Sequence, residues 1–206
     1  LRGMHTVSAF CTPSVILLSD ESLRGFSRMY RVTNRTVDLT VLSEINDFSF
    51  NLKNTQQSYA EIMYFLNKKF NKPARPAYVD VLCSAVAGSC FAVVLGGGTN
   101  EFIAALFGSL LSMAFLKKLA AFRPSSFWAT TMAGGIICAV TLGFHALVPA
   151  TSMEETIAGA IMPYLPGMAF TNGLRDYIAG DLISGNSRVA EAAFLVGGLV
   201  MGIATV

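Results

Sequence analysis

The feature that most constrains this chain is a series of long hydrophobic runs that follow Pro76. Residues 77–96 contain one charged residue, Asp80, and residues 127–149 contain none. A helix needs roughly 20 apolar residues to cross the hydrocarbon core of a bilayer, and shorter runs span it when the helix tilts or breaks. The second part of the chain is therefore predicted to be an integral membrane bundle.

Five runs share this apolar character and define the predicted spans: residues 77–96, 102–116, 127–149, 156–170 and 189–206. The fourth run carries Pro163 and the pair Pro166-Gly167. Proline lacks the backbone donor that a helix interior needs, so the fourth helix should break there. The expected fold is mainly α, a polytopic bundle of about five transmembrane helices with the fourth broken at Pro-Gly.

The residues before the first span have a different composition. Residues 1–76 hold ten of the 15 Lys and Arg residues and six of the 13 Asp and Glu residues. The β-branched run 7–19 and the segment 25–33 predict strands, and Pro13 makes the first strand an edge or splits it. Two helices follow by apolar spacing. We therefore predict a cytoplasmic α+β domain and linker over 1–76 and a transmembrane helical domain over 77–206.

The positions of the basic residues predict how the spans are oriented in the membrane. The Lys and Arg residues that flank the spans all fall on one side of a five-span topology, at Lys68, Lys69, Lys72, Arg75, Lys117, Lys118, Arg123 and Arg188. The loops 97–101 and 150–155, on the other side, contain Glu and no Lys or Arg. The positive-inside rule then places the N-terminal domain in the cytoplasm.

Polar chemistry is concentrated between Pro166 and Glu191. A helix that restarts after Gly167 presents free N–H groups and a positive dipole end, which suit an anionic group. Thr171 and Arg175 are four residues apart, as are Asn172 and Asp176, so each pair shares a helical face. The same groups could instead be interfacial anchors or a structural ion-pair network, and the helix break favours the functional interpretation.

The same segment resembles the signature of the threonine/serine exporter family (ThrE and YjjP-like proteins). The resemblance covers essentially the whole chain, including Thr12–Leu17, Arg31-Val32, Asp38-Leu39 and Gly96-Gly97. Its C-terminal motif consists of Pro166, Gly167, Thr171, Asn172, Arg175, Asp176, Gly180, Asp181, Ser184, Gly185, Arg188, Glu191 and Ala192. The helix that usually opens the N-terminal domain is missing, and fused members continue with a second membrane half.

The resemblance implies a YjjP-type half-transporter of the bacterial inner (plasma) membrane that works with a second small membrane subunit, a YjjB-type half. The expected function is export of threonine and serine or of succinate-type dicarboxylates, driven by the proton motive force. A higher oligomer is possible, and no cofactor or metal is expected. His5 and His145 are far apart, and the four cysteines show no CxxC pattern.

Roles for individual residues are hypotheses from their chemistry. The substrate-binding candidates are Pro166, Gly167, Thr171, Asn172, Arg175, Asp176, Asp181 and Arg188, with Arg175 on the substrate carboxylate. The proton-coupling candidates are Asp176, Asp181 and Glu191, the last of these inside the fifth span. Asp80, at the start of the first span, is a weaker candidate for a residue that faces the transport pathway.

The residues alone leave two other classes of function open. A channel for small organic acids would need a continuous polar pore and no proton coupling. A non-transporting assembly or regulatory subunit would use the cytoplasmic domain as an interaction module. An enzyme is disfavoured, because the spans contain no Ser/His, paired-Asp or HExxH arrangement.

Overall fold

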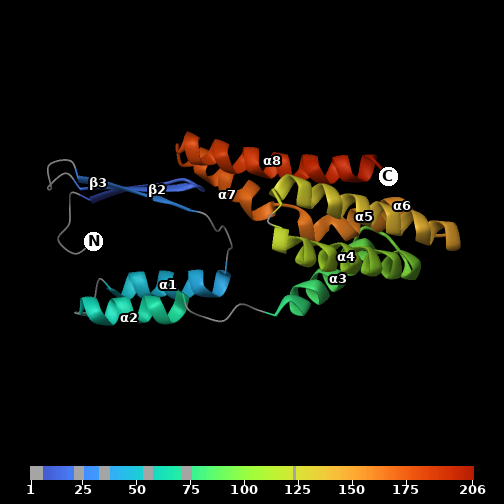
Figure 1. Cartoon of the computed structure of the whole chain (residues 1–206), viewed down its shortest axis with the longest axis horizontal. Helices are drawn as coiled ribbons and strands as arrows, with labels where there is room; N and C mark the ends of the chain where they lie inside the picture. Colours follow the sequence, from blue (N-terminus) through green and yellow to red (C-terminus); the bar gives the residue numbers. More distant parts are fainter. Residues whose placement is uncertain (1–6, 21–25, 33–37, 53–57, 71–75, 123) are drawn as a thin grey trace. The chain divides into compact units, whose positions relative to one another are not determined.

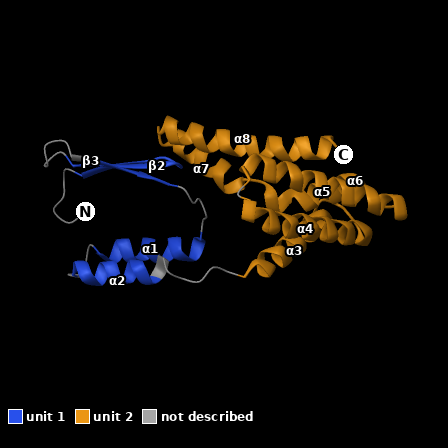
Figure 2. Cartoon of the chain, in the orientation of Figure 1, with its two compact units in different colours: residues 1–74 blue, residues 75–206 orange. Residues whose placement is uncertain are grey.

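The computed structural model describes residues 7–20, 26–32, 38–52, 58–70, 76–122 and 124–206. Contacts divide the chain into two compact units, Leu1–Ala74 and Arg75–Val206 (Figure 2). Of the predicted linker at 71–76, residues 71–75 lie outside the described residues. So does Arg123, one of the basic residues behind the predicted orientation.

Three strands of the first unit form an antiparallel sheet in the order β1 (Val7–Cys11), β2 (Val15–Asp20) and β3 (Phe26–Arg31). The predicted strand 7–19 is split at Pro13. Thr12 closes the turn, because its N–H donates to the carbonyl of Val15 at 2.8 Å and its Oγ1 accepts from the N–H of Val15 at 3.1 Å. Proline is well tolerated inside such a turn, since it needs no ladder hydrogen bond there.

Two helices complete the first unit, α1 (Leu39–Leu52) and α2 (Tyr59–Phe70). Asp38 caps α1, with its Oδ1 accepting from the N–H of Thr40 at 2.9 Å. The rings of Phe48 and Phe65 stack with centroids 4.2 Å apart. No residue of α1 is buried, so this pair of helices has little apolar core.

The second unit is a helical bundle (Figure 1). Its helices are α3 (Ala77–Val94), α4 (Thr99–Leu119), α5 (Ser126–Leu147), α6 (Met153–Ile161), α7 (Gly167–Ile178) and α8 (Leu182–Ala204), with 3-10 turns η2 (Ala120–Phe122) and η3 (Met162–Tyr164). In the described part of the chain, four helical stretches are long and apolar enough to cross a membrane: α3, α4 with η2, α5 and α8. The predicted mainly helical membrane fold is confirmed at this level.

The predicted fourth span is divided into short pieces. Helix α6 ends at Ile161, η3 follows, and α7 begins at Gly167 directly after Pro166. The break therefore occurs at the predicted proline-glycine pair. Because neither α6 nor α7 has the length of a span, the number of five transmembrane helices stays a prediction.

Two predicted boundaries were wrong, because helix-starting residues lie outside the apolar runs. Helix α8 begins at Leu182 and not at residue 189, so Arg188, which was predicted to precede the span, lies within the helix. Helix α4 begins at Thr99, which places Glu101 in its first turn and not in a loop. An acidic side chain in the first turn of a helix is favoured by the helix dipole.

Small residues make the helix contacts of the bundle. Its fully buried apolar side chains are mostly alanines, and the larger ones among them are Ile137 and Leu199. A Cβ on Gly159 of α6 would overlap the backbone of Ala92 in α3, and one on Gly202 of α8 would overlap the carbonyl of Thr131 in α5. Lipid supplies no hydrophobic drive for helix association, so such close backbone approach is the source of stability.

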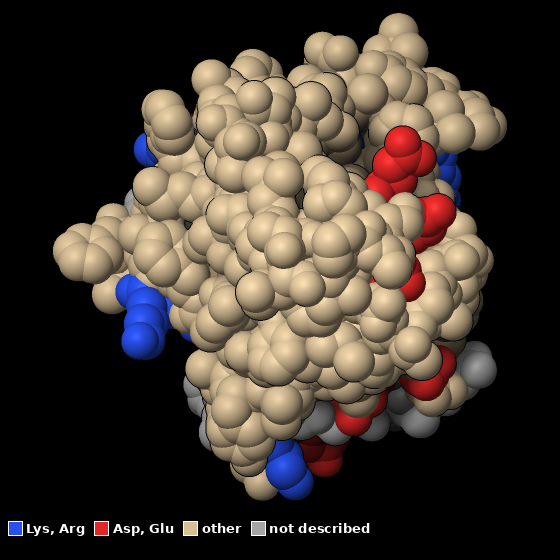
Figure 3. Space-filling model, turned by 90° about the vertical axis from the view of Figure 1, so that its right-hand side faces the viewer, with Lys and Arg blue, Asp and Glu red and all other residues tan. Residues whose placement is uncertain are grey.

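The outer surface of the bundle is apolar. Large hydrophobic side chains such as Val94 and Phe107 are exposed, and Leu147 is exposed by 83%. The face seen in Figure 3 consists mostly of residues other than Lys, Arg, Asp and Glu. This inversion of the soluble pattern, with small residues inside and large apolar residues outside, fits helices surrounded by lipid.

Glu101 fastens one end of the bundle. Its carboxylate is only 7% exposed, with Oε2 accepting from the N–H of Gly98 at 2.7 Å and Oε1 accepting from the N–H of Ser152 at 2.6 Å. A buried charge is tolerated when hydrogen bonds satisfy it. The side chain thereby joins the α3–α4 turn to the start of α6, and we call this the Glu101 end.

Replacing Gly202 with alanine should lower the stability of the second unit by about 1–3 kcal/mol, because the added methyl group would force α8 away from α5. Thermal unfolding of the purified protein in detergent measures the change. Gly197→Ala is the matched control on the same helix, since a Cβ there meets no atom within 4 Å. Equal melting temperatures for the two variants would contradict the close packing of α5 and α8.

Candidate functional site

Helices α7 and α8 form a tight hairpin that carries most of the predicted site residues. Gly180, with φ of +84°, ends α7, a backbone conformation that glycine adopts without strain. A Cβ on Gly173 would lie 2.8 Å from Cγ2 of Val189, and a Cβ on Gly185 would lie 3.0 Å from the carbonyl oxygen of Gly173. Gly173 and Gly185 thus allow the helices to touch.

The hairpin is placed at one end of the bundle. Helix α8 runs parallel to α5, because Gly198 meets Thr130 while Gly202 meets Thr131 and Gly135. The ring of Phe194 lies 6.4 Å from that of Phe127, at the start of α5. The part of α8 before Phe194, together with α7, therefore extends past the first turn of α5 (Figure 1).

Asp176 and Arg188 meet across this hairpin. Oδ2 of Asp176 lies 2.9 Å from Nε of Arg188, and the two side chains are 27% and 34% exposed. One turn of α7 also contacts α8 through Tyr177, whose hydroxyl donates to Oδ1 of Asn186 at 3.3 Å. Two of the predicted site residues are thus brought together as an ion pair that joins the helices.

Asp181 caps the N-terminus of α8. Its Oδ1 accepts from the N–H of Ser184 at 3.2 Å, and its Oδ2 accepts from the hydroxyl of the same serine at 2.7 Å. Both carboxylate oxygens are therefore engaged in starting the helix. This geometry gives Asp181 a structural role, and its predicted part in binding or proton coupling stays a prediction.

The remaining predicted residues are spread along the hairpin. Gly167, Thr171 and Arg175 are exposed, and Pro166 and Asn172 are half-buried. Glu191 is half-buried on α8, one turn before Phe194 and one turn after Arg188. These groups share one end of the bundle, and none of them is among the residues that line the hollow described next.

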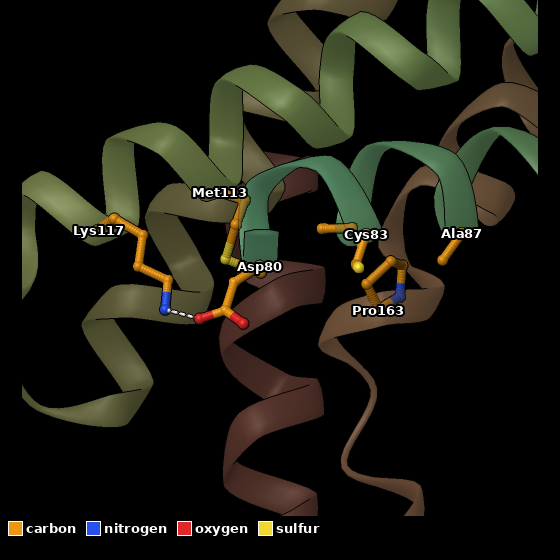
Figure 4. A pocket seen from close by; sticks show the side chains of 7 residues that line it. Asp80, Cys83, Ala87, Met113, Lys117 and Pro163 are labelled. Carbon is orange, nitrogen blue, oxygen red and sulfur yellow. Dashed lines mark hydrogen bonds and ion pairs between the residues drawn. The ribbon is translucent and has the colours of Figure 1, made fainter. Parts of the chain in front are cut away.

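A hollow of about 430 Å³ opens instead beside the helix break. It is lined by Asp80, Cys83, Ser84 and Ala87 of α3, Met113 and Lys117 of α4, and Pro163 of η3 (Figure 4). Lys117 forms an ion pair with Asp80, and the two side chains are 37% and 41% exposed. We call this end of the bundle the Lys117 end.

Hydroxyl groups lie behind the rim of the hollow. Ser84 is 5% exposed, and its Oγ faces the hydroxyl of Tyr164 but forms no hydrogen bond of full geometry within the described residues. The hydroxyl of Tyr164 lies 2.5 Å from Oγ of Ser112, so η3 is held against α4. Ser109 extends this polar strip by donating to the carbonyl of Ala160 in α6 at 3.2 Å.

Sequence reasoning named Asp80 as a minor candidate and missed Lys117, Ser84 and Tyr164 as neighbours. One signal was available. Helices α3 and α4 are joined by a short turn, so residues at equal distances from it lie opposite each other. Asp80 lies 14 residues before the end of α3 and Lys117 lies 18 residues after the start of α4, so the pair departs from this condition by about one helical turn. The hydroxyls gave no signal, because serine in an apolar run is also a common packing residue.

The hollow is suited to binding by charge and hydrogen bonds. It offers one cation, one anion and a buried hydroxyl within one lining. Within the residues that the structure describes, no group of three His, Cys, Asp or Glu side chains could hold a metal ion.

The chain was compared with protein-family models, with curated proteins and with solved structures. The model of the ThrE family, described as "Putative threonine/serine exporter", matches residues 2–206. A Klebsiella aerogenes protein named "Probable succinate transporter subunit YjjP" is 22% identical over 207 residues, which cover 98% of this chain and 78% of that protein. No solved structure matches the chain.

Two substitutions distinguish the helix-capping role of Asp181 from a role that requires its negative charge. Asp181→Ala should destabilise the protein by about 1 kcal/mol, because the N–H of Ser184 loses its acceptor. Asp181→Asn should leave thermal stability nearly unchanged, since an amide oxygen also caps a helix. A large loss of stability in Asp181→Asn would show that the negative charge itself is required.

Proposed function

This chain belongs to the threonine/serine exporter family, and on that premise we propose that it is a subunit of a secondary exporter for small hydrophilic amino or carboxylic acids. The family match over residues 2–206 is the observation that carries the proposal. The membrane bundle with a helix broken at Pro166-Gly167 supports it, because broken helices beside polar groups form substrate sites in transporters.

The substrate class is threonine and serine or a succinate-type dicarboxylate, and the driving force is the proton motive force. The similar Klebsiella protein is named a subunit, which supports a second small membrane subunit, a YjjB-type half, as the partner of this chain. We place the protein in the bacterial inner membrane with its N-terminal domain in the cytoplasm.

Within the hairpin, Arg175 is the group we assign to the substrate carboxylate during transport. It is exposed on α7, two turns after the break, and the Asp176–Arg188 pair beside it fixes the position of α8. Asp176 and Glu191 are the carboxylates we assign to proton coupling. Pro166, Gly167, Thr171 and Asn172 shape the start of α7, from which its free N–H groups face the substrate.

Transport in vesicles that contain the chain and its partner tests this assignment. Labelled threonine or succinate should accumulate against its gradient, and an uncoupler should abolish the accumulation. Arg175→Ala should lower the flux by roughly 10-fold or more, because a hydrogen bond to a charged group contributes about 1.5–3 kcal/mol. Ser187→Ala, an exposed change on α8, should transport normally.

Three results would contradict the proposal in different ways. Downhill flux that an uncoupler does not affect would indicate a channel. Unchanged flux in folded Arg175→Ala and Asp176→Asn variants would make the hairpin a scaffold. No flux of either substrate would leave the non-transporting subunit as the better description.

Orientation can be measured with single cysteines in a protein whose exposed Cys11, Cys83 and Cys90 are replaced by serine. Lys118→Cys, at the Lys117 end, should react with a membrane-impermeant maleimide in inside-out vesicles only. Glu154→Cys, in the first turn of α6 at the Glu101 end, should react from the outside of intact cells. The reverse pattern would overturn the predicted cytoplasmic N-terminus.

A further inference from the structure

We propose that the hollow at the Lys117 end is a binding site for a zwitterionic α-amino acid, with Lys117 on its carboxylate and Asp80 on its ammonium group. The inference rests on the proposed transport function and assigns the substrate class of its entry site. It moves the point of first contact from the α7–α8 hairpin to the walls formed by α3, α4 and η3.

The ion pair between Asp80 and Lys117 can open at little cost. Both side chains are more than a third exposed, and ion pairs between exposed side chains add little to stability. An amino acid carries the same two charges at neighbouring atoms. It can therefore replace each partner of the pair at once, so neither Asp80 nor Lys117 is left uncompensated.

The lining also distinguishes between the two substrate classes. Lys117 is the only basic residue among the seven that line the hollow, and Asp80 is the only acidic one. A dicarboxylate would place its second negative charge near Asp80, where like charges repel. The charges of the hollow therefore match a zwitterion better than a dianion.

Ser84 supplies the second observation, because its almost fully buried hydroxyl lies in the same lining, faces the hydroxyl of Tyr164 and forms no hydrogen bond of full geometry in the described chain. Buried polar groups are normally paired, and an exception suggests a missing partner. The carboxylate or the side-chain hydroxyl of a bound amino acid would provide it. The volume of about 430 Å³ lies within the usual range of small-molecule sites, roughly 300–1,000 Å³.

The hollow is also connected to the break in the fourth helical segment. Pro163 forms part of its wall and lies three residues before Pro166. The Tyr164–Ser112 contact holds this wall on α4. A ligand in the hollow therefore touches the segment that joins α6 to α7, which is where a transporter can couple binding to movement of a helix.

Cys83 provides a direct measurement, because its thiol is exposed and lines the hollow. In a protein with Cys11→Ser and Cys90→Ser, the alkylation rate of Cys83 is measured with threonine or succinate present. Threonine at ten times its dissociation constant should slow the reaction by about tenfold, following the occupancy of the site. Succinate at the same concentration should slow it by less than about twofold.

Charge variants test the assignment of each group. Lys117→Gln should abolish protection by threonine. Asp80→Asn should weaken protection by threonine and create protection by succinate, because the hollow then carries only a positive charge. Lys118→Gln, on the neighbouring exposed residue, should behave as the unaltered chain does. Thermal unfolding of each variant checks that the bundle is intact.

The outcomes separate this inference from the exporter proposal. If vesicles exchange threonine but Cys83 reacts at the same rate with and without it, the hollow is not the site and the exporter proposal stands. If succinate protects Cys83 as well as threonine does, the zwitterion assignment is wrong. If the charge variants retain full protection, the ion pair is only structural. If neither exchange nor protection occurs, both proposals fail.

Discussion

Close contact between helix backbones is the constraint on which the rest of this bundle depends. Lipid surrounds the helices with a medium as apolar as their own side chains, so association must come from van der Waals packing and hydrogen bonds. Gly159 against Ala92 and Gly202 against Thr131 show how near the helices approach. Any larger side chain at these contacts would separate the helices and change the end of the bundle where the polar groups lie.

That packing explains why polar chemistry is found at two ends and at one break. Glu101 closes one end, with both carboxylate oxygens on backbone N–H groups. The other end keeps Asp80 and Lys117 partly exposed beside η3. Between them, the buried hydroxyl of Ser109 donates to a carbonyl of another helix, and that of Thr141 donates to a carbonyl of its own helix. The bundle thus has one end closed by hydrogen bonds and one end whose charged side chains are partly exposed.

The candidate site was only partly predictable. The Pro166-Gly167 break and the polar run after it follow from local rules, because proline cannot continue a helix and charges are rare in membrane spans. Asp181 meets Ser184 by a local rule, because the two residues are three apart and form an N-cap. The partner of Asp176 does not follow from a local rule, because Asp176 meets Arg188 where Gly173 and Gly185 bring α7 and α8 together. Five spans were predicted, whereas helix length supports four in the described part of the chain.

The sequence by itself determined the membrane class, the polar first unit and the position of the helix break, since each depends on the composition or backbone chemistry of a short segment. The tertiary structure decided which groups face one another. It extended α8 back to Leu182 and placed Asp80, Ser84 and Lys117 in one hollow. Lys117 lies more than 30 positions from Asp80 and Ser84 in the sequence, and their proximity is set by helix packing, which no local pattern specifies.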